Sequence, residues 1–269
     1  MRLFHHIFST FTRPSITQQV RECSGTRYTR WVTVLFCLLM SAHTLSQQVT
    51  IASSGSIPPY VYSESDTGIQ LDIIREALTL SGHTLKIRYL SNSRGLSFLK
   101  TKHVDGVINV PAGISHLFYS DSTIEYQNGV TALKSSELKI SEISDLQALR
   151  VVGFQNASNY FGAEFKAMSL KNDHYDEVVN QLAQLNMLFR NRCDAIVMDH
   201  RIYNYYFSTY KDELDFNQAT VFYKILPPSP RYVAFHNEVL RDSFNKGLQQ
   251  LKESGRHQEI IDQYLHSNH

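Results

Sequence analysis

The apolar positions after residue 46 fall into short strand-like runs separated by segments of helical periodicity. Residues 49–52 form an apolar run that predicts a strand, and residues 69–80 place their apolar side chains on one helical face. Residues 84–90 alternate in polarity and predict a second strand, followed by a short helix at 94–102 and a third strand at 104–110. This order is typical of a parallel sheet with right-handed crossovers.

The same order of strands and helices begins again in the second half, although the two halves share no sequence repeat. We expect strands at 129–133, 150–154, 195–198 and 231–235, and helices at 160–168, 176–191, 201–210, 237–254 and 258–265. The pattern therefore predicts an α/β protein built from two similar units.

Charge and composition exclude some classes of partner. The chain has 269 residues and a formal net charge of +1, but its first 46 residues hold five arginines and one acid. The rest of the chain therefore has a net charge near −3 and keeps no basic stripe. We expect no nucleic acid and no anionic membrane among its partners.

The N-terminal segment predicts export. An apolar run at 31–42 follows Arg27 and Arg30, and it is too short for a comfortable transmembrane helix. We predict a signal peptide at 1–46, cleaved after Ser46, and a periplasmic location; an uncleaved amphipathic anchor is the alternative. Of the three cysteines only Cys193 would remain, so we expect no internal disulfide.

Several short motifs along the chain occur in the order and spacing of one known family. They are Pro58-Pro59-Tyr60, Gly68-x-x-x-Asp72, the run from His103 to Ile108, Tyr119-Ser120-Asp121, Ser144-Asp145-Leu146, residues 150–158, the run from Asn191 to Ala195, and the run from Tyr232 to Phe235. With the closing segment from Leu248 to Tyr264, they make the chain resemble periplasmic solute-binding proteins of family 3, the polar-amino-acid kind of type II periplasmic binding protein.

The resemblance implies a two-lobed α/β fold with two β-sheet lobes, flanked by helices and joined by two hinge strands. Carried over, lobe 1 comprises 47–133 plus 232–269 and lobe 2 comprises 134–231, with hinges near 130–134 and 231–235. A ligand would lie in the cleft between the lobes, which close on it by hinge bending.

In lobe 1 the resemblance points to residues that follow predicted strands. Ile57 and Tyr60 would form an apolar and aromatic wall, unless Tyr60 packs beneath its loop, and Asn109 would face the ligand. The family's Thr-x-x-Arg element, whose Arg binds a carboxylate, reads Ile-Ser-His-Leu at 114–117 and has no Arg. Arg94 is a candidate replacement; the alternative is a solvated arginine at a helix end.

In lobe 2 two sites are candidates. Asn156, Ala157 and Ser158 lie between a predicted strand and a helix start, where free N–H groups and the helix dipole suit an anion. The alternative is simple N-capping by Ser158 or Asn159, and the two roles are compatible. Asp199 ends a predicted strand and would bind a ligand ammonium as in relatives, or would cap the next helix.

The motifs of catalytic and metal sites are missing from the sequence. We find no metal-ligand spacing, no nucleophile elbow and no phosphate loop, and we predict neither catalysis nor a cofactor. The predicted function is capture of a small polar solute, amino-acid-like or another small charged metabolite, by a monomer that delivers it to an ABC-type permease. The alternatives are a sensory protein that docks on a membrane receptor and, less favoured, a dehydratase-type enzyme using Glu125 and Asp199.

Overall fold

The computed structural model describes residues 46–110 and 112–266. The predicted signal peptide and its cleavage site therefore lie outside the described residues, apart from Ser46. None of the described helices is long and apolar enough to cross a membrane.

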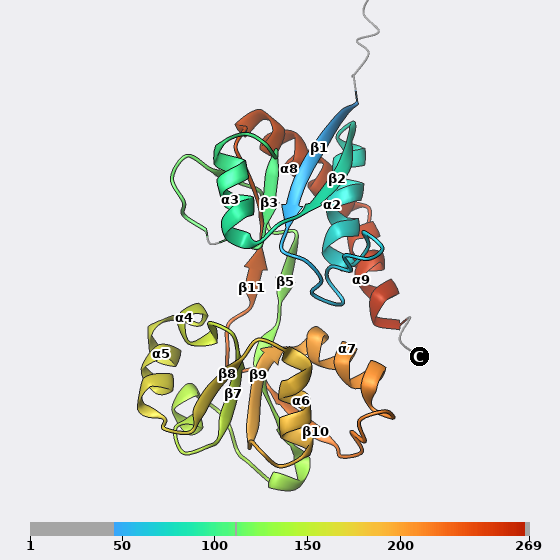
Figure 1. Cartoon of the computed structure of the whole chain (residues 1–269). Helices are drawn as coiled ribbons and strands as arrows, with labels where there is room; N and C mark the ends of the chain where they lie inside the picture. The colour runs from blue at the N-terminus through green and yellow to red at the C-terminus, as the bar shows by residue number, and fades with distance from the viewer. Residues whose placement is uncertain (1–45, 111, 267–269) are drawn as a thin grey trace, which may run out of the picture. The chain divides into compact units, whose positions relative to one another are not determined.

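The first sheet has the order β2-β1-β3-β12-β4, and Figure 1 labels its strands β1, β2 and β3. β1 (Gln47–Ser53) pairs in parallel with β2 (His83–Tyr89) and with β3 (Gly106–Ile108), as the sequence pattern predicts. β12 (Val233–Phe235) and β4 (Phe118–Tyr119) extend the sheet in antiparallel fashion. The carboxyl ends of β1 and β3 therefore meet at one edge of the sheet, where loops commonly bind ligands.

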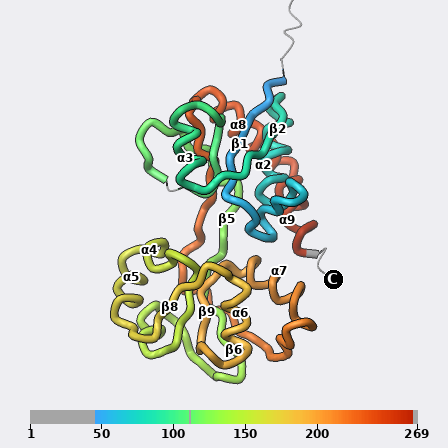
Figure 2. The backbone as a smooth tube through the Cα atoms, viewed as in Figure 1, coloured from blue at the N-terminus to red at the C-terminus, as the bar shows by residue number. Residues whose placement is uncertain are grey.

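Four helices belong to the first sheet, and two of them come from the end of the chain. α2 (Ile69–Leu80) has the predicted bounds, and α3 (Asn92–Lys100) precedes β3. α8 (Glu238–Glu253) and α9 (Arg256–His266) return to pack against α2, so that red and cyan segments lie together in Figure 2. α8 comes very close to α2 at Gly247, where a Cβ atom would lie 2.0 Å from the carbonyl oxygen of Ala77. The sequence places glycine where no side chain fits.

The second sheet has the order β10-β6-β9-β7-β8. Its strands are β6 (Asn128–Leu133), β7 (Val151–Phe154), β8 (Tyr175–Val178), β9 (Ala195–Asp199) and β10 (Thr220–Tyr223). Its helices are η1 (Lys134–Ser136), η2 (Ile143–Leu146), α4 (Ala157–Tyr160), α5 (Gly162–Lys171), α6 (Gln181–Phe189) and α7 (His200–Tyr210). β7, β8 and β9 are parallel, so their carboxyl ends also share one edge.

One predicted element is wrong. The helix expected at 176–191 begins only at Gln181, and β8 occupies the preceding residues as a strand parallel to β7. β8 lies at the edge of the sheet and is half exposed, so its four residues carry too little apolar periodicity to be recognised as a strand.

A two-stranded antiparallel ribbon connects the two sheets. It consists of β5 (Ile124–Tyr126) and β11 (Ser229–Arg231), each of which leads from one sheet to the other (Figure 1). β6 pairs with β9 and β10 and is therefore part of the second sheet, although the sequence analysis placed residues up to 133 in lobe 1. We propose that the lobes meet in the β5/β11 ribbon. An apolar run such as 129–133 shows that a strand forms, not which sheet it joins.

Candidate functional site

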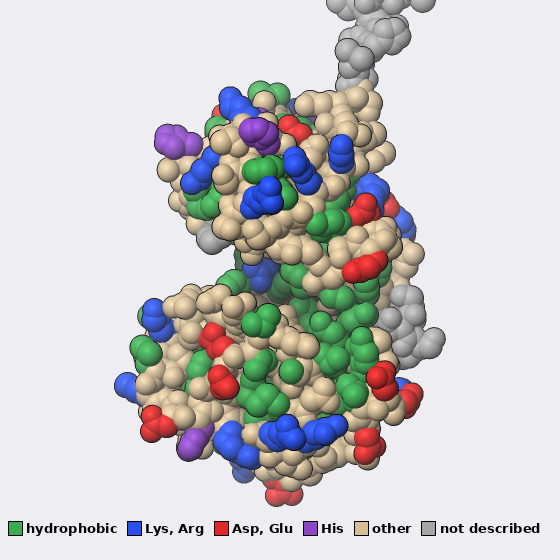
Figure 3. Space-filling model, viewed as in Figure 1, with side chains coloured by type: hydrophobic (Ala, Val, Ile, Leu, Met, Phe, Trp, Pro, Cys, Tyr) green, Lys and Arg blue, Asp and Glu red, His purple; other side chains and the backbone are tan. Residues whose placement is uncertain are grey.

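A pocket of about 320 Å³ lies where the carboxyl ends of several strands from both sheets converge. Its walls come from loops after β1 and β3, the starts of α3 and α6, α4, the ends of β7 and β9, and the β5/β11 ribbon. The lining residues are Ile57, Asn92, Asn109, Tyr126, Asn128, Phe154, Gln155, Tyr160, Gln181, Asp199, Ile202 and Arg231. Figure 3 shows the surface hollowed between α3 and α4, both of which contribute to this lining. We refer to this space as the amide pocket.

Amide side chains of the pocket have buried atoms without partners. Both side-chain polar atoms of Asn109, the nitrogen of Asn128 and the oxygen of Gln181 are buried and make no hydrogen bond within the described residues. Asn109 also has a φ of 61°, a left-handed conformation that asparagine tolerates better than most residues. Buried polar atoms are nearly always hydrogen-bonded, and each one left unpaired costs about 1–3 kcal/mol. Such a cluster in one pocket is what a polar ligand would satisfy.

Aromatic rings surround the basic residue of the pocket. The guanidinium carbon of Arg231 lies 4.1 Å from the ring centroid of Tyr126 and 5.0 Å from that of Tyr160. The Tyr160 hydroxyl hydrogen-bonds to Ser229, next to Arg231 on β11. Cation–π contacts of this kind contribute roughly 0.5–2 kcal/mol each. They hold the planar guanidinium in place, and its N–H groups make no hydrogen bond to the residues that the structure describes.

Asp199 lines the amide pocket, but its carboxylate is already occupied by donors from the protein. One oxygen accepts hydrogen bonds from the Tyr60 hydroxyl (2.9 Å) and from the backbone N–H groups of Arg201 (2.9 Å) and Ile202 (3.0 Å). The other accepts from the N–H of Gln127 at 2.7 Å. Burial raises the pKa of Asp199, which is 2 % exposed, and the hydrogen bonds offset part of that effect. Of its two predicted roles, this geometry matches the N-cap of α7.

Tyr60 does not line the amide pocket. It is fully buried, stacks on Tyr126 with ring centroids 3.9 Å apart, and donates to Asp199. Burial, together with the nearby charge of Asp199, raises the pKa of the Tyr60 hydroxyl, which therefore remains a donor. Of the two readings left open by the sequence, the structure matches the one in which Tyr60 packs beneath its loop. Ile57, three residues earlier, supplies the apolar wall instead.

The loop that carries Tyr60 is held against the start of α2. The N–H groups of Ile69 and Gln70 donate to the carbonyl oxygens of Pro59 and Tyr60, both at 3.0 Å. The approach requires Gly68, whose φ is 125° and where a Cβ would lie 2.5 Å from the Tyr60 oxygen. The first N–H groups of a helix have no intrahelical partner, and here the loop provides one.

The candidate anion site at Asn156–Ser158 already holds a carboxylate of the chain. The backbone N–H groups of Asn156 and Ser158 donate to Glu177 at 2.6 and 2.8 Å, and the Tyr175 hydroxyl donates at 2.9 Å. Partial burial raises the pKa of Glu177, but these hydrogen bonds outweigh it and the net pKa is lowered. Ala157 is fully buried, and none of 156–158 lines the amide pocket. The N–H groups expected to bind a ligand anion are thus occupied by Glu177 of the chain itself.

Arg94 is also placed away from the pocket. It is exposed, and its guanidinium lies over the ring of Phe98 at 5.5 Å. Asn92, at the start of the same helix, lines the pocket in its place. Of the predicted residues, the structure therefore brings together Ile57, Asn109 and Asp199.

The sequence analysis missed seven residues of the amide pocket that carry polar groups: Asn92, Tyr126, Asn128, Gln155, Tyr160, Gln181 and Arg231. Asn128 and Arg231 directly precede or begin predicted strands, a position that could have marked them as strand-end polar groups. Gln181 was hidden inside the helix wrongly predicted at 176–191. Tyr126 belongs to the connecting ribbon, for which the sequence gives no recognisable pattern.

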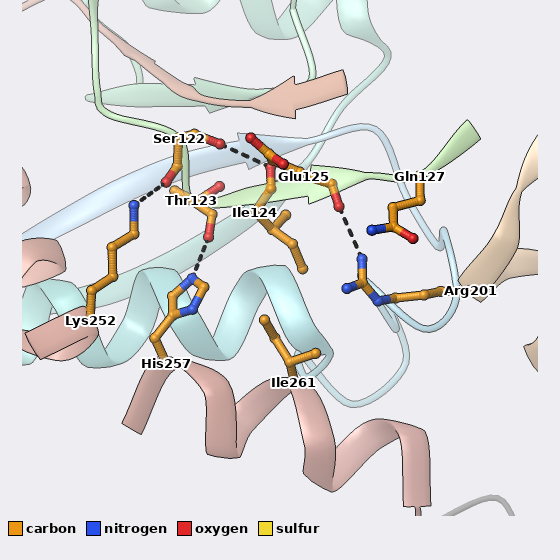
Figure 4. Close-up of a pocket in the computed structure, with 9 residues that line it drawn as sticks. All are labelled: Ser122, Thr123, Ile124, Glu125, Gln127, Arg201, Lys252, His257 and Ile261. Atoms are coloured by element: carbon orange, nitrogen blue, oxygen red, sulfur yellow. Dashed lines mark hydrogen bonds between the residues drawn. The ribbon is translucent and has the colours of Figure 1, made fainter. Parts of the chain in front are cut away.

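A second pocket, of about 290 Å³, lies between β5, α7 and α9 (Figure 4). Its basic side chains are engaged with backbone carbonyls: Arg201 with Glu125 at 3.0 Å, Lys252 with Ser122 and His257 with Thr123. Glu125 lines this pocket, whereas Asp199 lines the amide pocket, so the carboxylates suggested as a catalytic pair do not share a cavity. Within the described residues, no group of three or more His, Cys, Asp or Glu side chains could hold a metal.

Comparisons with known proteins agree with this architecture. The model of bacterial extracellular solute-binding proteins, family 3, matches residues 49–267. None of the curated proteins matches the chain.

Solved structures share the fold at low sequence identity. A histidine kinase sensor domain similar to periplasmic binding proteins is 16% identical, with a TM-score of 0.64 and coverage of 82% of this chain and 97% of that one. An ancestral arginine-binding protein bound to arginine is 17% identical, with a TM-score of 0.63 and coverage of 82% and 99%. An amino acid ABC transporter substrate-binding protein from Streptococcus pneumoniae, bound to L-arginine, is 15% identical, with a TM-score of 0.61 and coverage of 82% and 95%. These similarities establish the two-lobed fold.

Proposed function

Because the chain belongs to the bacterial extracellular solute-binding proteins of family 3, we propose that it captures a small polar organic solute in the amide pocket. The observation that carries this proposal is the set of buried, unpaired amide atoms on Asn109, Asn128 and Gln181. These atoms come from the loop after β3, from β6 and from α6, and thus from both sheets. A solute that bonds to all three would hold the two lobes together.

We further propose that the protein works in the periplasm and closes by bending at the β5/β11 ribbon. The ribbon contains only two short strands, so small changes at its ends can reorient the lobes. The closed form would dock on an inner-membrane permease and deliver an amino-acid-like or other small solute. The family and the transporter-associated relative with bound L-arginine support this direction.

A sensory role is the second candidate. It is favoured by one specific observation, the fold shared with a histidine kinase sensor domain. In that case the same closed form would dock on a membrane receptor. Solute capture is common to both roles, and the partner separates them.

Ligand-induced stabilisation tests the proposal directly. The purified protein is screened by thermal shift against amino acids, amines and small carboxylates. A ligand at about 100 times its Kd should raise the stability by about 2.7 kcal/mol. Asn128→Ala should abolish or strongly reduce the shift, since Asn128 is 4 % exposed in the amide pocket. Asn204→Ala, on the exposed face of α7 beside a different pocket, is the matched control and should respond as wild type. No shift with any compound, or equal shifts in both variants, would overturn the proposal.

A further inference from the structure

The amide pocket contains one acid, Asp199, and one base, Arg231, among its described lining residues, and only the base makes no hydrogen bond or ion pair through its side chain. Asp199 accepts four hydrogen bonds from the protein, which fills about as many lone-pair positions as a carboxylate has. Its charge is therefore compensated before any ligand arrives. A ligand ammonium group would have to compete with the Tyr60 hydroxyl and three backbone N–H groups to reach it.

Arg231, in contrast to Asp199, has side-chain hydrogen-bonding groups that the described residues leave unused. Its Nε is buried without a hydrogen-bond partner, and no carboxylate in the described part of the chain forms an ion pair with the side chain. The guanidinium lies over the rings of Tyr126 and Tyr160. These ring faces orient it, but they do not accept hydrogen bonds from the N–H groups in its plane as an oxygen atom would. An arginine fork held in this way matches a planar carboxylate.

We infer that the solute is a small carboxylate that carries no ammonium group, with its carboxylate bound by Arg231 and its remaining polar groups by the amides. This inference rests on the proposed function and names the ligand class of the same site. Arg231 stands on the hinge ribbon, whereas 114–117 and Arg94 supply no cation to the pocket. The anion site would thus lie on the connection between the lobes.

The neutral lining supports the absence of an ammonium group. Asn109, Asn128 and Gln181 offer donors and acceptors without charge, suited to hydroxyl or amide groups of a solute. A cationic group in this pocket would face Arg231, a charge of the same sign, with no free carboxylate among the described lining residues. The chemistry therefore favours a hydroxy acid or an amide acid over an amino acid.

Two matched series of compounds test the inference by calorimetric titration of the purified protein. The first comprises L-glutamine, glutaramate, which lacks the ammonium, and 4-aminobutanamide, which lacks the carboxylate; the second comprises L-serine, 3-hydroxypropanoate and ethanolamine. We expect binding by the members that have a carboxylate alone, weaker binding by the zwitterions and none by the amines. Arg231→Gln should weaken carboxylate binding at least about tenfold, the scale of a lost charge-assisted hydrogen bond.

Controls separate recognition from structure. Arg94→Gln removes an exposed arginine outside the pocket and should leave affinities unchanged. Arg231→Lys keeps the charge without the fork and should bind with intermediate affinity, which a merely structural role of Arg231 would not produce. Circular dichroism of the unliganded variants checks that they fold.

The possible failures are distinguishable. If amines or zwitterions bind more tightly than the matched carboxylates, or if Arg231→Gln binds carboxylates as wild type does, this inference is wrong while solute capture stands. If no compound from either series or from the wider panel of amino acids, amines and carboxylates binds, the proposed function fails, and this inference fails with it.

Discussion

Two stacked tyrosines, Tyr60 and Tyr126, should differ in how much stability they lose when each is replaced by phenylalanine. Replacing either by phenylalanine removes one hydroxyl oxygen and preserves the ring pair, whose centroids are 3.9 Å apart. Both side chains are buried, with exposed fractions of 0 % and 5 %. Their hydroxyls differ, because that of Tyr60 donates to Asp199 at 2.9 Å whereas that of Tyr126 has no partner among the described residues.

The magnitudes follow from that difference. A buried hydrogen bond to a carboxylate contributes about 1.5–3 kcal/mol, so Tyr60→Phe should reduce the free energy of unfolding by that amount. For a chain of this size the melting temperature should fall by roughly 3–12 °C. Tyr126→Phe removes a hydroxyl that is desolvated without compensation, and should leave the stability of the unliganded protein unchanged or raise it slightly.

Urea unfolding followed by circular dichroism, without ligand, measures both variants under the same conditions. The stacking contact is common to both, so the difference between the two free energies reports the hydrogen bonds of the Tyr60 hydroxyl, the one it donates to Asp199 and the longer one it accepts from Arg201 at 3.4 Å. Equal losses would show that ring packing dominates. A larger loss for Tyr126→Phe would refute the reasoning, since it would require a partner for the hydroxyl that we describe as unpaired.

Three further outcomes are expected. Glu177→Gln should destabilise the protein at neutral pH, where the carboxylate is ionised and accepts its hydrogen bonds. Despite partial burial, those hydrogen bonds lower the folded pKa of Glu177 below its ordinary value of 4.5, so the stabilisation is present above that value and disappears as the pH falls through the folded pKa; the urea curves of the two proteins should converge there. Gly68→Ala should lower the melting temperature more than Gly82→Ala. Both glycines have a positive φ, but only at Gly68 would a Cβ lie 2.5 Å from the backbone oxygen of Tyr60. Equal losses in the two variants would mean that backbone strain at positive φ, and not this steric contact, causes the loss. If the predicted signal peptide is removed, the exported protein loses Trp31, the only tryptophan, and should show tyrosine emission alone.

The fold followed from the sequence wherever apolar periodicity was long. α2 occupies its predicted residues, and the parallel pairing of β1 with β2 and β3 follows from the order of elements. The pattern failed where elements are short or exposed, as in the edge strand β8 and the three-residue strands β5 and β11. Such segments acquire their structure from a neighbouring strand and leave little local signal.

The site was harder to predict because a polar residue at a strand end can be satisfied from within the chain. Asp199 and the loop at 156–158 have the chemistry of ligand-binding groups, yet Asp199 binds Tyr60 and three backbone amides, and the loop binds Glu177. Tyr60 and Glu177 are 139 and 21 residues away from the groups they contact, separations that no local pattern encodes. Under the proposed function, recognition would fall to groups that the described part of the fold leaves without a hydrogen bond, such as the Nε of Arg231. The sequence therefore shows which residues could contact a solute, whereas the hydrogen-bond network of the folded chain determines which of them are still free to do so.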